Sequence, residues 1–423
     1  MQPTEQDEEA NLKSSGEPLR LVYITVSMPF GPEEAFLVAE ANELTRQGCD
    51  MLIVPRSPKG KIFNQDAVGL GRRSLRRPLL GPSVVFFALL ESLRRPGATI
   101  RALKLVMQSQ SARTRIKNGA AFPKGLWLAC VARKWRADHI HAHWGTTTAT
   151  MALVAGEVTR IPWSLTLHRD DIAHPNLLGA KMEKAFFTRF ISRSGLEIAR
   201  DVGALVPSDR SRVIHMGVSI PELPPAARTG TRIFTLLCPA HLYPVKGQEY
   251  LVDAVAILHD RELPCLLLLV GQGGLRTSLE QQVARLDLTA AIRFLGQVPH
   301  EKIVGWYQEG AIDAVVLPSV DLGEHEHEGI PVSLMEAMAY AIPVVSTSTG
   351  GVPELLGEGA GVIVRPRDPT ALADAVERLI RDPLLRSRLG AAGRQRIKEQ
   401  YSVERTSAEL LACIRAGPSG GSL

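Results

Sequence analysis

Two glutamates stand eight positions apart in the stretch EHEHEGIPVSLMEAMAYAIPVVSTSTGG, residues 324–351. Glu328 ends a polar run, and Glu336 lies inside the apolar run that follows Pro331. An ionised carboxylate only accepts hydrogen bonds, so each acid suits a group that carries adjacent hydroxyls, such as a ribose or another sugar. Two carboxylates at this spacing could therefore hold two sugar rings. A solvated acidic loop followed by a surface glutamate is the alternative interpretation.

The elements around these acids can be predicted from the local pattern. AIDAVVLPS (311–319) is typical of a buried strand and residues 320–328 of a loop, while a helix is predicted from Pro331 to about Tyr340, since proline at the first helical position loses no hydrogen bond. At ~1.5 Å per residue, the distance from Pro331 to Glu336 is ~7.5 Å, about the span of a diphosphate with one sugar beside it. The start of a helix favours an anion. The pattern predicts a clamp for a nucleotide-diphosphate sugar.

Short apolar strands alternate with helical stretches along most of the chain. Strands are predicted at 19–27, 50–55, 138–145 and 163–168, a helix at 33–48, and a second series of strands and helices after 231. This alternation predicts an α/β fold with two doubly wound Rossmann-like domains, whose ligand-binding edges would face each other across an interdomain cleft. The predicted parts are a disordered tail (1–18), an amino-terminal domain (19–218), a Pro-rich linker (219–231), a carboxyl-terminal domain (232–402), and a last helix with its tail (403–423) that could return to the amino-terminal domain.

Composition narrows the class of protein. A chain of 423 residues, 45% of them hydrophobic, is long enough for two cores. The five cysteines are odd in number, far apart and mostly set in apolar runs, which indicates reduced thiols and a reducing compartment. The first residues lack the basic and apolar regions of a signal peptide, and no uncharged apolar run reaches the ~18 residues of a membrane-spanning helix. We therefore expect a cytoplasmic protein.

The basic residues are concentrated in one part of the chain. Residues 71–136 hold 15 Lys and Arg against a single acid, Glu91, whereas the net charge of the whole chain is only +5. Within it, the stretch 71–106 places arginine pairs on either side of an apolar core. This arrangement predicts binding to an anionic membrane surface, with an ordinary domain helix and solvated arginines as the alternative. A nucleic-acid site over 71–136 is the other alternative, but Phe86 and Phe87 lie together in an apolar run instead of being interleaved with the cations, so we expect no nucleic acid.

The stretch EGIPVSLMEAMAYAIPVVSTSTGGVPELL (328–356) resembles the E-x7-E signature of retaining glycosyltransferase family 4. Further segments, all before residue 328, also resemble this family and occur in the same order as in the family. The likeness covers roughly residues 20 to 402. HIHAHWG (139–145) and TLHRDDI (166–172) look most like the bacterial branch that builds exopolysaccharides of the colanic-acid kind. The other segments are SRVIHMGV (211–218), PVKGQEYLVDA (244–254), VGQGGLRTSLE (270–280) and FLGQVPHEKIVGWYQ (294–308).

The resemblance implies a GT-B fold, a UDP- or GDP-linked sugar as donor, no metal or other cofactor, and retention of the anomeric configuration. By the same resemblance, Glu336 would hold the ribose hydroxyls and Glu328 the donor sugar. The backbone N–H groups of Gly329 and Ile330 would lie near the sugar and phosphates, and Lys246 would contact the diphosphate. Without a metal, the charge that develops on a nucleoside diphosphate leaving group needs a fixed cation, which agrees with a lysine there.

His241 and the segment GQGGLR (271–276) depart from familiar nucleotide-binding patterns. His241 stands where the family usually has a phosphate-binding arginine, and a histidine lacks the permanent charge and the two-pronged geometry of a guanidinium, so its contact with phosphate is in doubt. GQGGLR does not match a dinucleotide site, because Arg276 replaces the third glycine. The resemblance instead makes Gly271 and Gly273 part of a loop beside the nucleotide.

The histidines of the amino-terminal half give a weaker signal. His139, His141 and His143 share one face of a strand, but no cysteine or acid lies at ligand spacing, so no metal site is expected. His168 ends the strand WSLTLH, where the resemblance places it near the donor sugar with Asp171 as a support. A core histidine is the alternative.

The loop SMPFGPEEAF (27–36) has one glycine and two prolines where many relatives have a glycine pair. We expect this loop, with Gly31 and Glu34, to line the acceptor side. Taken together, the chain is predicted to be a retaining, metal-independent hexosyltransferase that adds a sugar to a glycan acceptor, a lipid-linked oligosaccharide, in exopolysaccharide or cell-surface polysaccharide biosynthesis. It would be peripheral on the inner face of the plasma membrane. An epimerase or hydrolase of nucleotide sugars on the same fold is the alternative.

Overall fold

The computed structural model describes residues 18–31, 34–62, 65–109, 111–222 and 233–416. Most of the predicted tail (1–18), most of the predicted linker (219–231) and the last seven residues lie outside this part of the chain. The chain divides into two compact units, Met1–Leu165 with Lys184–Phe186, and Thr166–Glu183 with Phe187–Leu423. The domain boundaries drawn from the sequence stay a prediction.

The first sheet has six strands in the order β2-β1-β3-β4-β5-β6. β1 pairs in parallel with β2 on one side and with β3 on the other, as expected for a doubly wound sheet. β1 is an apolar run, as expected where both faces of a sheet are covered, whereas β3 alternates histidine with apolar residues and β5 and β6 are short and more polar. Their bounds are β1 Leu19–Thr25, β2 Cys49–Pro55, β3 His139–His143, β4 Trp163–Leu167, β5 Thr188–Phe190 and β6 Ser211–Val213.

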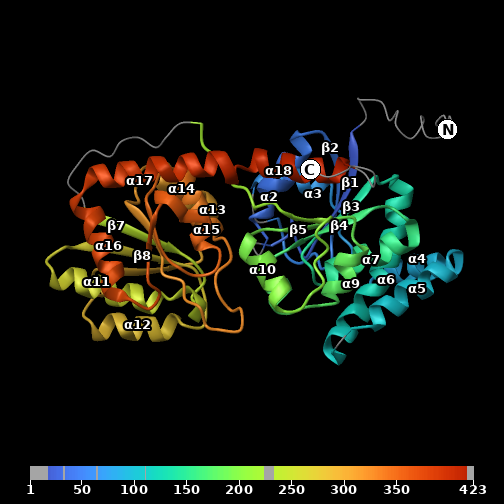
Figure 1. The fold of residues 1–423 in the computed structure, drawn as a ribbon, viewed down its shortest axis with the longest axis horizontal. Helices are drawn as coiled ribbons and strands as arrows, with labels where there is room; N and C mark the ends of the chain where they lie inside the picture. The colour runs from blue at the N-terminus through green and yellow to red at the C-terminus, as the bar shows by residue number, and fades with distance from the viewer. Residues whose placement is uncertain (1–17, 32–33, 63–64, 110, 223–232, 417–423) are drawn as a thin grey trace. The chain divides into compact units, whose positions relative to one another are not determined.

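The helices that accompany this sheet include a set of three, α4 to α6, inserted between β2 and β3 (Figure 1). The helix predicted over 33–48 is shorter than expected, since α2 begins only at Leu37. No helix in the described ranges combines the length and the apolar character needed to cross a membrane. The helices are α2 Leu37–Arg46, α3 Val68–Arg72, α4 Pro82–Arg94, α5 Pro96–Met107, α6 Ala112–Trp135, α7 Thr147–Thr159, α8 Arg169–Ala173, α9 Leu178–Lys184 and α10 Arg193–Asp201, with a 3-10 turn η1 at Gln65–Ala67.

The second sheet also has six strands, in the order β12-β11-β10-β7-β8-β9, and every pair of neighbours is parallel. The four inner strands are short and largely buried, whereas the edge strands β9 and β12 are more exposed. The bounds are β7 Phe234–Pro239, β8 Cys265–Val270, β9 Ile292–Gly296, β10 Ala314–Leu317, β11 Val344–Thr347 and β12 Val362–Val364. The two sheets confirm the predicted α/β class.

Helices cover this sheet too; α11 packs between α12 and α16, and α14 contacts α17 (Figure 1). The predicted helix from Pro331 to Tyr340 was wrong by one residue at each end. Pro331 has an extended backbone (φ −77°, ψ 114°) and caps α14 instead of starting it. The remaining helices of the chain are α11 Gln248–Asp260, α12 Arg276–Arg285, α13 His300–Gln308, α14 Val332–Ala339, α15 Val352–Leu356, α16 Pro369–Arg381, α17 Pro383–Arg396 and α18 Val403–Arg415, with short turns η2 Pro244–Lys246, η3 Gly357–Gly359 and η4 Ile397–Tyr401.

A buried lysine on α6 ties together three segments of the first unit. The ammonium group of Lys124 donates to the carbonyl oxygens of Pro55 at 2.6 Å, Arg56 at 2.8 Å and Arg77 at 2.7 Å. An ammonium has three N–H donors, so these three bonds use all of them. The side chain therefore fixes the end of β2 and the segment before α4 against α6.

Replacing Lys124 by Met should destabilise this unit by about 2–4 kcal/mol, because one buried and two part-buried carbonyl oxygens would lose their donor. Denaturant unfolding of the full chain, followed by circular dichroism, measures the change. Lys117→Met on the exposed side of the same helix is the matched control and should leave the midpoint almost unchanged. Equal midpoints for the two variants would show that the three bonds do not stabilise the fold.

Candidate functional site

The strand order of the second sheet creates a switch point between β10 and β7. The chain leaves β7 toward β8 on one side, while β10 lies on the other side, so the loops after β7 and β10 separate at their carboxyl ends. These two loops, 240–247 and 318–331, carry Lys246 and Glu328. They are joined by a hydrogen bond of 2.9 Å from Val320 N to the carbonyl oxygen of Val245. Ligands of open parallel sheets bind at such a point, so this is the candidate site.

Lys246 and Glu328 form an ion pair at this point. The ammonium nitrogen lies 2.5 Å from Oε2 of Glu328, and the hydroxyl of Ser319 donates to the same oxygen at 3.0 Å. Both charged side chains are only partly exposed. The fold thus brings a cation and a carboxylate that are 82 positions apart in the sequence into direct contact. Ser319 was not among the residues predicted for the site.

The turn after β11 supports the main chain of Glu328. Gly351 N donates to the carbonyl oxygen of Glu328 at 3.3 Å, and a Cβ on Gly350 would lie 1.8 Å from that oxygen. Only glycine can approach a carbonyl this closely. Nδ1 of His327 lies 2.8 Å from the same oxygen. The Gly-Gly pair therefore holds the segment of Glu328, Gly329 and Ile330 just before α14.

Glu336 lies on α14 and contacts a histidine that the sequence prediction did not include. Its Oε1 is 2.8 Å from Nε2 of His300, the first residue of α13, and both side chains are partly exposed. His300 lies within the segment FLGQVPHEKIVGWYQ, which resembles the family, and that is the only signal in the sequence that could have pointed to it. The imidazole fixes one oxygen of the carboxylate and leaves the other to accept from a ligand.

The loop after β8 packs flat against the loop after β7. A Cβ on Gly271 would lie 2.1 Å from the carbonyl oxygen of Ala240, and one on Gly273 would lie 2.2 Å from that of Leu242. His241 is exposed between them, with Nδ1 3.3 Å from the carbonyl oxygen of Gln272. The structure therefore brings the predicted residues Gly271, Gly273 and His241 together, in the loops that follow two neighbouring strands of the sheet.

His168 and Asp171 lie at the end of β4 in the first sheet. His168 caps α8, and Oδ2 of Asp171 accepts from its backbone N–H at 3.1 Å. Burial, with the positive charge of Arg189 as a smaller cause, lowers the pKa of His168 to about 3. The imidazole is therefore neutral near pH 7, and it can donate or accept a hydrogen bond but cannot supply a positive charge.

Glu34 lies at the switch point of the first sheet, between the ends of β1 and β3. Its buried carboxylate accepts from the backbone N–H groups of Val26, Ser27 and Met28 at 3.0, 2.5 and 2.7 Å, and from Nε1 of Trp144 at 2.6 Å. Gly31, with φ +79°, lies within the same loop. Glu34 therefore shapes the loop that was predicted to line the acceptor side, and a direct contact with an acceptor stays a prediction.

The three histidines of β3 are buried and contact neighbouring polar side chains. His139 and His141 each lie within 2.8 Å of the hydroxyl of Ser164, and His143 is 2.9 Å from that of Tyr23. Tyr23 in turn donates to Glu40 at 2.7 Å. Among the described residues, no group of three or more His, Cys, Asp or Glu is arranged to hold a metal ion. These histidines have structural partners.

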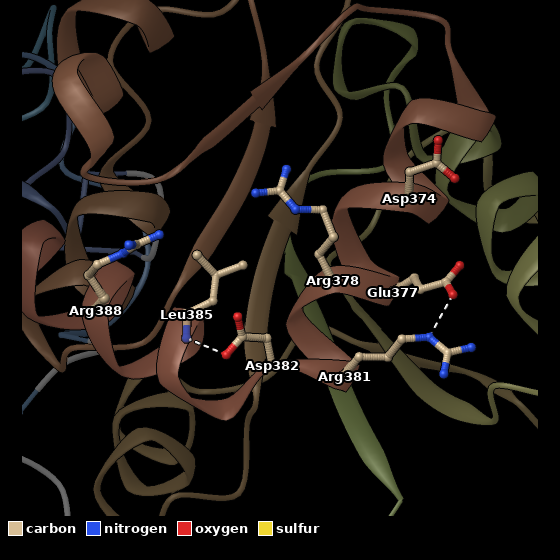
Figure 2. A pocket seen from close by; sticks show the side chains of 7 residues that line it. All are labelled: Asp374, Glu377, Arg378, Arg381, Asp382, Leu385 and Arg388. Atoms are coloured by element: carbon tan, nitrogen blue, oxygen red, sulfur yellow. Dashed lines mark hydrogen bonds and ion pairs between the residues drawn. The ribbon is translucent and has the colours of Figure 1, made fainter.

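A shallow hollow of about 460 Å³ lies between α16 and α17 (Figure 2). Much of its polar lining is used within the protein, since Arg381 pairs with Glu377 and the Asp382 side chain caps α17. No residue predicted for the site lines it. The lining residues are Asp374, Glu377, Arg378, Arg381, Asp382, Leu385 and Arg388.

The loops of the second sheet and α14 therefore contain most of the residues predicted for the site. This part of the chain is similar to a known protein family. Residues 222–396 match the family of glycosyl transferases group 1. The match contains the ion pair of Lys246 and Glu328, the glycine loop after β8, and Glu336.

Relatives of known name cover parts of the chain. A GDP-mannose-dependent monoacylated alpha-(1-6)-phosphatidylinositol monomannoside mannosyltransferase of Corynebacterium glutamicum is 27% identical over 43% of this chain and 47% of its own length. A putative colanic acid biosynthesis glycosyltransferase of Escherichia coli, WcaL, is 26% identical over 68% of this chain and 72% of its own length. The chain spans about half the length of the first curated relatives it matches.

Solved structures match almost the whole chain. The Anabaena protein HepE, in complex with UDP, superimposes with a TM-score of 0.68 at 17% sequence identity, over 94% of this chain and 100% of HepE. HepE has also been solved with UDP-glucose. At this level of identity the likeness shows the fold, and it confirms the predicted GT-B architecture with two Rossmann-like parts.

Proposed function

We propose that this protein is a retaining glycosyltransferase that moves a sugar from a nucleotide-diphosphate sugar to a glycan acceptor without a metal ion. The observation that carries the proposal is the pair of Lys246 and Glu328 at the switch point of the second sheet, with Glu336 on the helix that follows. The match of residues 222–396 to glycosyl transferases group 1 supports it. Further support comes from the mannosyltransferase whose name states that it depends on GDP-mannose, and from HepE, whose structure contains UDP-glucose.

Each side chain of the candidate site has a role in this proposal. Glu336, held by His300, accepts from the ribose hydroxyls, and Glu328 accepts from a hydroxyl of the donor sugar. Lys246 lies next to Glu328, where it can contact the diphosphate, together with the N–H groups of Gly329 and Ile330. The loop with Gly271, Gly273 and His241 lies beside the nucleotide. His168, supported by Asp171, orients the donor as a neutral imidazole.

The chemistry breaks the bond between the anomeric carbon and the diphosphate and forms a bond from that carbon to the acceptor oxygen on the same face. The diphosphate oxygen that leaves takes the acceptor proton, so no carboxylate needs to act as a nucleophile. Negative charge grows on the diphosphate as the bond breaks. Lys246 supplies a fixed cation for that charge, which is the reason why we propose a reaction independent of metal ions.

The acceptor in this proposal is a lipid-linked oligosaccharide of a cell-surface polysaccharide, met at the inner face of the plasma membrane. The support is the likeness to WcaL, which is named for colanic acid biosynthesis, and to the mannosyltransferase that acts on a phosphatidylinositol glycolipid. The loop shaped by Glu34, which contains Gly31, would face this acceptor.

A thermal-shift screen of UDP, GDP, UDP-glucose and GDP-mannose, in the presence of a strong chelator, tests the donor site. A ligand at about a hundred times its Kd should add about 2.7 kcal/mol to the stability of the folded protein. The donor that is found is then supplied with a lipid-linked oligosaccharide, and the product's anomeric configuration is read by NMR. Stabilisation by no nucleotide, donor consumption without an acceptor, activity that needs a divalent ion, or an inverted product would each contradict part of the proposal.

A further inference from the structure

The helix α4 exposes an apolar face to solvent. It buries Val84, Ala88 and Glu91, which lie at helical spacing on one side. On the opposite side Phe86, Leu89 and Leu93 are 62%, 62% and 80% exposed. Three further apolar side chains on the same helix are partly exposed, namely Val85, Phe87 and Leu90. Single exposed apolar side chains are common, but six on one helix make a patch of the kind that marks an interaction surface.

The next helix, α5, contacts α4 and α6 and repeats this arrangement (Figure 1). Ala102 and Val106 are buried, whereas Ile100, Leu103 and Met107 are exposed at a spacing of three and four residues. Two consecutive helices therefore each present an apolar stripe outward. The sequence predicted a membrane-binding stretch at 71–106, but it did not show which apolar side chains face outward.

The charges around these stripes are positive. Arg94, Arg95, Arg101 and Lys104 are exposed at the end of α4 and on α5. Of these, Arg101 lies 3.9 Å from Glu157 of α7, with 52% of its side chain exposed. The single acid of the two helices, Glu91, is buried and pairs with the Arg133 guanidinium through bonds of 2.7 and 2.5 Å. Its charge is thus neutralised inside the protein.

The structure also changes which arginines of 71–106 can serve as surface cations. Arg73 lies 3.4 Å from Asp50, and Arg76 donates to the carbonyl oxygen of Gly60 at 2.9 Å. These two side chains contact the protein, whereas Arg94, Arg95 and Lys104 lie on or directly beside the helices that carry the apolar stripes.

We propose that the outward faces of α4 and α5 dock on an anionic lipid bilayer, with Phe86, Leu89 and Leu93 entering the interface and the neighbouring cations contacting lipid phosphates. Exposed apolar side chains next to cations match the two components of such a surface. A second copy of the chain would bring its own excess of cations into contact with these. A nucleic acid would leave the apolar side chains without a partner.

Docking itself needs neither donor nor acceptor, whereas its use in meeting a lipid-linked acceptor rests on the proposed function. The full chain is therefore tested first by co-sedimentation with vesicles made of equal parts of phosphatidylglycerol and phosphatidylcholine, and with vesicles of phosphatidylcholine alone. We expect binding at least about tenfold stronger to the anionic vesicles, weakened as salt rises from about 0.05 M to about 0.5 M.

Two variants separate the apolar part from the charged part. Phe86→Ser with Leu89→Ser and Leu93→Ser should lower binding by at least about tenfold, and Arg94→Gln with Arg95→Gln, Arg101→Gln and Lys104→Gln should lower it by a similar factor and remove most of the salt dependence. Leu205→Ser with Leu384→Ser, which changes two exposed leucines elsewhere, is the matched control and should bind as the unchanged protein does. All altered side chains are exposed, so the unfolding midpoints should agree.

The outcomes distinguish the docking from the proposed function. Vesicle binding without sugar transfer would contradict the proposed function only, and transfer without vesicle binding would contradict the docking only. If the unchanged protein ignores anionic vesicles and sedimentation velocity shows a dimer that the triple serine variant dissociates, the partner is a second copy and the membrane proposal is overturned.

Discussion

Lys246→Ala should lower kcat by about 10²–10³-fold while changing the affinity for the donor far less. The reason is that the charge on the diphosphate grows as the glycosidic bond breaks, so a fixed cation contributes most in the transition state. Turnover is measured by release of nucleoside diphosphate in the presence of acceptor, and donor affinity by calorimetry. The exposed Lys398 provides a control, because Lys398→Ala removes the same charge away from the candidate site.

The ion pair with Glu328 gives a second explanation for such a loss, which a further variant tests. If Lys246 served only to neutralise that carboxylate, removing both charges in Lys246→Ala with Glu328→Gln would restore turnover relative to Lys246→Ala alone. We expect the double variant to stay as slow as the single one or slower. An unchanged kcat in Lys246→Ala would remove this lysine from the chemistry.

Glu336→Ala should weaken the binding of free UDP or GDP and of the matching nucleotide sugar by the same factor, about 10- to 150-fold, because the ribose belongs to both ligands and a hydrogen bond to a charged acceptor is worth about 1.5–3 kcal/mol. Glu328→Ala should leave the binding of the free nucleotide intact and weaken only the nucleotide sugar. Calorimetry with both ligands measures the two affinities for each variant.

Glu324→Ala is the control for these two variants, since Glu324 is an exposed acid on the same loop as Glu328. It should change neither affinity. The assignment of the two sites would be reversed if Glu328→Ala weakened the free nucleotide and Glu336→Ala did not. If both variants weakened it equally, the division of the clamp between ribose and donor sugar would be lost.

Most strands were predictable because a parallel sheet that is covered on both faces leaves apolar runs in the sequence. The loops that follow β7, β8 and β10 were predictable for the same reason, since each begins where a run ends. The strands β5 and β6 were missed, because each has only three residues and carries an arginine. Membrane binding by 71–106 was predicted from the sequence, but the side chains of α4 and α5 that face outward were not, because an apolar residue in the sequence carries no sign of whether it faces a core or a partner. Hydrophobic spacing finds a face but not what covers it.

The contacts of single polar side chains were harder to predict. Glu34 turns back onto the N–H groups of its own loop, and this depends on the path of the backbone, which spacing does not give. His300 meets Glu336 from a different helix, 36 positions away in the sequence. The resemblance to a family named the acids but not the side chains that orient them.

The support of Glu328 by the turn after β11 has a consequence for engineering the protein. The main chain of 328–330 is held from the side of Gly350 and Gly351, while the exposed loop before it closes on itself through bonds between Leu322 and Glu326 and between Glu326 and Gly323. The side chains of residues 321–326 can therefore be varied in a library without moving the carboxylate, whereas His327 contacts the carbonyl oxygen of Glu328 and stays fixed. Any side chain added at Gly350 would instead displace it, so a search for altered sugar preference should randomise the loop and leave the glycine pair fixed.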